Sequence, residues 1–110
     1  MKEREIQHAV RLAASQIPGL VLWRNGVGVA KTDDRTVRYG LCRGSSDLIG
    51  LLAPQGRFIA LELKTETGRL RPEQVLFLEL VRARGGFACV VRSVEELHAA
   101  IERARQGLDQ

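Results

Sequence analysis

Three residues in one short stretch have the types and the spacing for hydrolytic chemistry. Asp47 stands before an apolar run, and Glu62 and Lys64 end the next apolar run, two positions apart. Strand side chains alternate between two faces, so Glu62 and Lys64 are predicted to share one face and the intervening aliphatic residues the other. Asp47 reaches the same place if the two runs pair as an antiparallel hairpin.

Two carboxylates that converge near a lysine suit a hard divalent cation, because magnesium takes oxygen ligands and keeps several waters. Such a site can position a water molecule and stabilise negative charge on a phosphate during hydrolysis. A Glu-x-Lys at a strand end is also common on a solvated surface. On Asp47, Glu62 and Lys64 alone, both interpretations stay open.

An N-terminal helix is predicted over residues 3–16, and it supplies a further acid. Glu3 lies about 40° from the centre of the apolar stripe on a helical wheel and Glu5 about 120° away. Glu3 is therefore expected to point toward the core side. The alternative is that Glu3 stands there only because the helix dipole stabilises an acid in the first turn. The stripe consists of Ile6, Val10, Ala13 and Ile17.

A strand over residues 20–23 leads into a segment, residues 26–44, that is rich in glycine, threonine, aspartate and arginine. This segment can form a short hairpin that pairs residues 28–31 with residues 36–39. Loops beside a catalytic face often hold substrate, although a single basic residue is more often an ordinary surface charge. The candidate phosphate contacts are Arg24, Asn25, Lys31, Arg38 and Arg43.

The second half of the chain reads as two strands, a helix, a strand and a helix. The strands are predicted at 47–53, 57–64 and 87–91, and the helices at 72–84 and from the capping box Ser93-Val94-Glu95-Glu96 onward. Pro72 suits the first position of its helix. Gln74 shares the inward stripe of that helix and is expected to orient a phosphate or to bond a neighbouring backbone group. The tail from Gly107 is expected to fray.

Composition limits the function classes. The 110 residues fit one domain spanning 1–110, and 45% hydrophobic with 27% charged residues indicate a globular protein. No apolar run is long enough to cross a bilayer and no signal-peptide core follows the N-terminus, so a cytoplasmic location is expected. The net charge of +4 favours a polyanionic partner. Seven basic residues lie between Arg24 and Lys64, around the candidate site.

The cysteines and histidines argue against a structural zinc site. Cys42 and Cys89 lie far apart without a Cys-x-x-Cys pair, and no histidine stands at ligand spacing. Two reduced thiols, at least one of them buried, are expected in the cytoplasm. His8 and His98 fall at polar helix positions and are interpreted as surface residues.

The order of these elements and motifs resembles the PD-(D/E)xK nucleases of the restriction-endonuclease-like fold and, more narrowly, a stand-alone VRR-NUC domain. The similarity covers about residues 3 to 100, and the family's usual Pro-Asp is Ser46-Asp47 here. A lone Asp…Glu-x-Lys is weak evidence, but five phrases in this order are specific. They are Glu3-x-x-Ile6-Gln7, Trp23-Arg24-Asn25, Gly44-Ser45-Ser46-Asp47-Leu48-Ile49-Gly50, Glu62-Leu63-Lys64 and Arg71-Pro72-Glu73-Gln74.

The resemblance implies an α/β fold with a restriction-endonuclease-like core, in which helices flank a central mixed β-sheet in the order α-β-β-β-α-β-α. It also implies metal-dependent hydrolysis of DNA. Asp47, Glu62 and the Leu63 carbonyl would hold Mg²⁺ or Mn²⁺, and Lys64 would orient the attacking water. Glu3 would act through the outer shell or hold a second ion, and Gln74 would support the site.

The resemblance extends to partners and setting. Single-domain members of the family, typical of phages and bacteria, resemble Holliday-junction resolvases and act as homodimers, so a four-way DNA junction and a second copy are the expected partners. Two other hypotheses stay open: a nuclease on flaps or ends that needs a partner, and a catalytically silent DNA- or protein-binding module. The residue pattern does not select the dimer surface; the last helix and residues 26–44 are its two candidates.

Overall fold

Alternating strands and helices make up the computed structural model, which describes residues 2–110. The order of elements is the one predicted, with the optional hairpin present. The elements are α1 (Glu3–Ala14), β1 (Leu20–Arg24), β2 (Gly28–Lys31), β3 (Thr36–Tyr39), β4 (Leu48–Leu52), β5 (Arg57–Leu63), α2 (Pro72–Ala83), β6 (Phe87–Val91) and α3 (Val94–Arg105).

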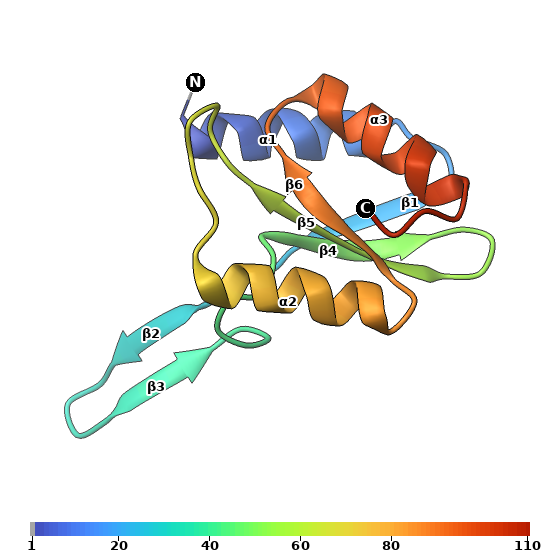
Figure 1. The fold of residues 1–110 in the computed structure, drawn as a ribbon. Coiled ribbons are helices and arrows are strands. Elements are labelled where there is room, and N and C mark those ends of the chain that lie inside the picture. Colours follow the sequence, from blue (N-terminus) through green and yellow to red (C-terminus); the bar gives the residue numbers. More distant parts are fainter. Residues whose placement is uncertain (1) are drawn as a thin grey trace.

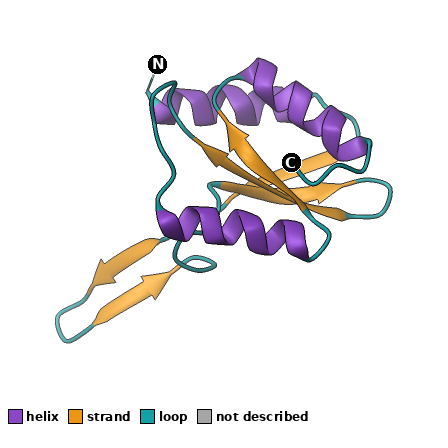
Figure 2. Cartoon of the chain, in the orientation of Figure 1, coloured by secondary structure: helices purple, strands orange, loops and turns teal. Residues whose placement is uncertain are grey.

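Four strands form a central mixed sheet in the order β1-β4-β5-β6. β4 pairs antiparallel with both β1 and β5, whereas β5 and β6 run parallel (Figure 2). The parallel pair needs a crossover connection, which α2 supplies. The antiparallel pairing of β4 with β5, on which convergence of Asp47 and Glu62 depends, is therefore confirmed, with Leu48 opposite Leu61.

Helices cover both faces of this sheet (Figure 1). On one face, α1 and α3 pack on the odd-numbered aliphatic residues of β5, namely Ile59, Leu61 and Leu63, all of which are buried. On the other face, α2 packs on Ala60 of β5 and Ala88 of β6. The alternation predicted for β5 is confirmed, and it directs Glu62 to the same face as α2.

Several element bounds differ from the prediction by one or two residues; β4, for example, spans Leu48–Leu52 and not 47–53. Helix α1 ends at Ala14 and not at residue 16, because the chain already turns ahead of Pro18-Gly19, where Gly19 has a φ of +80°. The C-terminal tail was expected to fray, but it is held by hydrogen bonds. The Ala88 amide donates to the Asp109 carbonyl at 3.0 Å, and Arg103 Nε donates to the Gln110 carbonyl at 3.1 Å.

Strands β2 and β3 form a separate two-stranded hairpin that projects away from the main sheet (Figure 1). All of its residues except the half-buried Gly28 are exposed. Both cysteines are free, with Cys42 exposed and Cys89 buried, as expected. His8 and His98 are exposed. Within residues 2–110, no helix has the length and apolar character needed to cross a membrane.

Candidate active site

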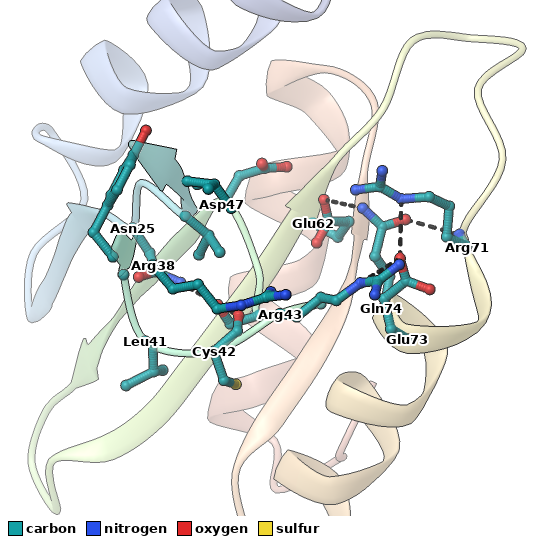
Figure 3. A pocket seen from close by; sticks show the side chains of 17 residues that line it. Asn25, Arg38, Leu41, Cys42, Arg43, Asp47, Glu62, Arg71, Glu73 and Gln74 are labelled. Carbon is teal, nitrogen blue, oxygen red and sulfur yellow. Dashed lines mark hydrogen bonds and ion pairs between the residues drawn. The ribbon is translucent and has the colours of Figure 1, made fainter. Parts of the chain in front are cut away.

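The strand register brings Asp47 and Glu62 together. Asp47 directly precedes β4 and Glu62 directly follows the residue that pairs with Leu48, so the two acids stand at the same end of the β4–β5 pair. Asp47 Oδ2 accepts a hydrogen bond from the Leu63 amide at 2.8 Å. Both side chains lie in one cleft (Figure 3). The convergence of Asp47 and Glu62 that the alternating pattern predicted is therefore present in the structure.

Glu62 is an almost fully buried acid, with 2% of its surface exposed. Its Oε1 accepts a hydrogen bond from Gln74 Nε2 at 3.2 Å, whereas Oε2 has no hydrogen-bond partner in the described chain. Burial, followed by the neighbouring Asp47 carboxylate, raises the pKa of Glu62 to about 9. A buried carboxylate with an unpartnered oxygen is costly unless a further group satisfies it.

The start of α2 holds Gln74 in place. Pro72 occupies the first turn, as predicted, and the Arg71 amide donates to Gln74 Oε1 at 2.8 Å. The opposite end of the same amide group donates to Glu62 (Figure 3). Of the two alternatives for Gln74, the structure contains the bond to a neighbouring backbone group, and it adds a bond to the acid. Gln74 therefore orients Glu62 relative to the helix.

Lys64 and Glu3 lie beside the acids but outside the residues that line the cleft. After the larger effects of burial and Asp47, the Lys64 ammonium lowers the pKa of Glu62 and the Glu3 carboxylate raises it. Glu3 is nevertheless exposed, so a place near the apolar stripe does not bury its side chain. Residues 3–5 at the start of α1 are all exposed, and the buried stripe of the helix begins at Ile6.

The cleft around the acids has a volume of about 590 Å³. It lies between the hairpin, the loop that follows it and the start of α2. Among the predicted DNA contacts, Asn25, Arg38 and Arg43 line this cleft, whereas Arg24 and Lys31 do not. The lining residues are Asn25, Val27, Gly28, Val29, Arg38, Tyr39, Gly40, Leu41, Cys42, Arg43, Gly44, Ser45, Asp47, Glu62, Arg71, Glu73 and Gln74.

Asn25 is engaged with the loop that carries Asp47. Its side-chain Nδ2 donates to Ser45 Oγ at 2.8 Å and to the Ser46 carbonyl at 2.9 Å. Its backbone amide donates to the Asp47 carbonyl at 2.8 Å. These bonds connect the end of β1 to the residue before β4. The side-chain donors of Asn25 are thus already used within the chain, so its first task is to position Asp47.

Glycine at position 44 brings that loop against α2. Gly44 has a φ of +88°, and a Cβ there would overlap the Glu73 carbonyl oxygen and lie 2.7 Å from its carbonyl carbon. Only glycine fits a left-handed backbone in such close contact. The contact places Arg43 beside the start of α2, where its Nε lies 3.7 Å from Glu73 Oε1.

Three cleft residues were missed by the sequence reasoning: Arg71, Glu73 and Tyr39. Arg71 and Glu73 belong to one of the five phrases that carry the family resemblance, but neither was proposed as a site residue, although the N-terminus of a helix is itself suited to an anion. Arg71 Nε lies 3.5 Å from the Glu73 oxygen that also faces Arg43. Tyr39 ends the hairpin strand β3 opposite Gly28; the hairpin was predicted, but the sequence does not show that the end of β3 lies at the cleft.

The acids fit a hard divalent cation. Asp47 retains Oδ1 beside the oxygen bonded to the Leu63 amide, and Glu62 Oε2 has no hydrogen-bond partner within residues 2–110. Residues 2–110 contain no group of three or more His, Cys, Asp or Glu side chains suited to a metal. Magnesium binds through one or two carboxylates and keeps waters, so a two-carboxylate site is sufficient for it, whereas zinc prefers nitrogen and sulfur ligands.

Comparison with known proteins agrees with this geometry. The model of the VRR-NUC domain family matches residues 29–95, which include Asp47, Glu62, Lys64 and Gln74. A solved structure described as a VRR_NUC domain superposes with a TM-score of 0.62 at 24% sequence identity, over 91% of this chain and 94% of that one. No curated protein matches. The solved structure establishes the fold, and the family model matches most of the chain.

Proposed function

Because this chain belongs to the VRR-NUC domain family, which is part of the restriction-endonuclease-like nuclease superfamily, we propose that it is a divalent-metal-dependent endonuclease that hydrolyses DNA phosphodiester bonds. The observation that carries this proposal is the pair Asp47 and Glu62 in a cleft edged by arginines. One carboxylate oxygen of Glu62 is buried and has no hydrogen-bond partner among the residues that the structure describes, and a cation would satisfy it.

Each residue has a separate task in the proposed reaction. Asp47, Glu62 and the Leu63 carbonyl would hold Mg²⁺ or Mn²⁺, which supplies charge stabilisation at the phosphate and a more acidic water. Lys64 orients the attacking water and stabilises the developing negative charge. Gln74 fixes the rotamer of Glu62 through the 3.2 Å bond. Glu3, outside the cleft, acts through water on the same site.

We further propose that the enzyme acts as a homodimer on branched DNA, in particular on four-way junctions. A two-fold dimer presents two sites to a roughly symmetric junction. The support for a second copy is the part of the sheet that α2 leaves uncovered. There Val21 pairs with Leu51 and Trp23 with Ile49. Val21, Trp23 and Leu51 are 50%, 52% and 42% exposed.

These exposed apolar side chains on β1 and β4 are what a self-association surface needs. Helix α3, one of the two surfaces considered from the sequence, is less suitable. Its exposed side chains are mainly charged or polar, and charged residues are depleted from the centre of protein interfaces. We therefore assign the second copy to the β1–β4 face and keep the hairpin for DNA.

The test of the catalytic assignment is cleavage of labelled DNA by shape-preserving variants. Asp47→Asn and Glu62→Gln each keep an oxygen that accepts the observed hydrogen bond, so they remove charge with little change of shape. Each is expected to lower cleavage by at least about 100-fold, as loss of an electrostatic stabiliser does in other enzymes. Glu79→Gln, an exposed acid on α2, is the matched control.

The substrate set is a four-way junction, a flap, a single strand and a continuous duplex, each with magnesium, manganese or chelator. Paired symmetric nicks on the junction that disappear with chelator support the full proposal. Cleavage of flaps or ends instead keeps the metal site and removes the junction assignment. DNA binding without any metal-dependent cleavage contradicts the enzyme and favours the silent binding module. Glu3→Ala is expected to lower cleavage, whereas Glu5→Ala is not.

A further inference from the structure

Tyr39 is the one tyrosine of the chain, and it lines the same cleft as Asp47 and Glu62. It ends β3, at the base of the projecting hairpin. Its side chain is 54% exposed, although tyrosine has a large apolar ring that would gain from burial. The proposed hydrolysis gives Tyr39 no task, so its exposure at the cleft needs another explanation.

The ring of Tyr39 is held against the opposite strand. Tyr39 pairs with Gly28 in the hairpin register, and a Cβ at position 28 would overlap the tyrosine hydroxyl and lie 2.6 Å from Cζ. Any side chain at position 28 would displace the ring. Glycine therefore lets one side of the ring lie on the backbone, and the exposed remainder of the ring is available at the cleft.

An exposed aromatic ring in a cleft that also holds arginines is suited to stacking on a nucleobase. Stacking does not depend on the identity of the base, because every base has a π-face. Arg38 and Arg43 line the same cleft and can contact the adjoining phosphates. In a continuous duplex both faces of each base are covered by neighbours. At a branch point, a flap or an end, one base face is free.

We propose that Tyr39 stacks on the free base face at a branch point beside the scissile phosphate, and that this contact makes the enzyme select branched DNA over continuous duplex. The inference rests on the proposed function, since it names the feature of DNA that the same cleft recognises. Gly28 is the positioning residue for this contact. It has no side chain to touch the DNA, but its lack of a Cβ determines where the Tyr39 ring lies.

The experiment compares Tyr39→Leu with Tyr39→Phe, Gly28→Ala and the control Val37→Ala. Val37 lies on the same hairpin face, two residues before Tyr39, and does not line the cleft. The readouts are kcat/KM on a four-way junction and on a continuous duplex, and the fluorescence of 2-aminopurine placed at the branch, measured with chelator. Stacking quenches that fluorescence, so the second readout works without cleavage.

Tyr39→Leu and Gly28→Ala are expected to lower the preference for the junction over the duplex by about 5- to 150-fold, the range for one base stacked on an aromatic ring. They are also expected to abolish the quenching. Tyr39→Phe and Val37→Ala are expected to match the wild type. Equal losses on junction and duplex, or quenching that survives in Tyr39→Leu, would overturn the inference.

The two proposals fail in distinguishable ways. If the wild type binds branched DNA and quenches the probe through Tyr39 but cuts nothing, the nuclease assignment fails and the stacking inference stands. If it cuts junctions with metal and Tyr39→Leu cuts them with the same preference, the nuclease assignment stands and the inference fails.

Discussion

At the scale of single residues, Glu62 makes the metal-free fold less stable than it would otherwise be. An acid with a raised folded-state pKa binds protons more tightly in the folded than in the unfolded chain. Its contribution is therefore most favourable below its ordinary pKa of 4.5 and is lost as the pH rises toward about 9. The buried charge of Glu62 therefore lowers the stability of the metal-free fold, and a bound cation would offset this loss of stability.

We predict that Glu62→Gln raises the free energy of unfolding of the metal-free protein, and that the gain grows with pH. The variant keeps the oxygen that accepts from Gln74 Nε2 and has no charge to desolvate. The difference from the wild type is expected to be small at pH 4 and to reach roughly 1–3 kcal/mol by pH 8. Urea unfolding in chelator between these pH values measures it.

Magnesium supplies the complementary half of this experiment. A ligand that binds only the folded chain stabilises it, so magnesium is expected to raise the stability of the wild type and not that of Glu62→Gln. All other carboxylates are common to the two proteins, so the difference isolates Glu62. A stability difference that stays constant with pH would show that Glu62 is not the group that titrates.

At the scale of elements, the alternation along residues 57–64 was sufficient to predict which face of β5 carries Glu62. The burial of Glu62 was not predictable, because it depends on α2 returning over the sheet after the parallel crossover and placing Gln74 beside it. The hairpin was predicted with its observed bounds. Its relation to the cleft depends on the close contacts at Gly28 and Gly44, which only the folded structure shows.

The start of α2 organises two arginines around one acid. Glu73 Oε1 faces both Arg43 and Arg71, whose side chains are largely exposed. Exposed ion pairs contribute little to stability, with a median between about 0 and 1 kcal/mol. The arrangement therefore has more consequence for DNA than for the fold, because it holds two guanidinium groups at the mouth of the cleft, where phosphates would lie.

We predict that Arg43→Ala and Arg71→Ala each weaken DNA binding and lower the slope of log Kobs against log salt by about 0.9, the value for one lost phosphate contact. The melting temperature is expected to stay unchanged. Binding titrations in chelator over a range of salt concentrations measure the slope. Arg11→Ala, an exposed arginine on α1 across the sheet from α2, is the control. An unchanged slope in both cleft variants would exclude these arginines from the DNA contact.

At the scale of the whole molecule, one face of the sheet is only partly covered. Helices α1 and α3 together cover the first face, whereas α2 alone packs over β5 and β6 on the second. The sequence predicted the apolar side chains of β1 but not which of them would remain exposed, because strand order and helix placement decide that. A protomer with an uncovered apolar face and one cleft is suited to a two-fold assembly that presents two clefts to one DNA molecule.

We predict that the wild type is a dimer at micromolar concentration and that Val21→Glu makes it a monomer. Val21 pairs with Leu51 at the centre of the uncovered face, so a two-fold contact would bury the new charge without a partner. Trp23, the one tryptophan of the chain, lies two residues further along β1. Its emission is expected to shift to longer wavelength on dissociation, and sedimentation measures the mass directly. Leu12→Glu, an exposed leucine on α1, is the control that should stay dimeric.

The Val21→Glu monomer is expected to keep metal-dependent nicking and to lose the pairing of nicks on opposite arms of a junction, because each protomer carries a complete cleft. A wild-type monomer, or paired nicks from the Val21→Glu monomer, would contradict the assembly and leave the single cleft as the whole enzyme.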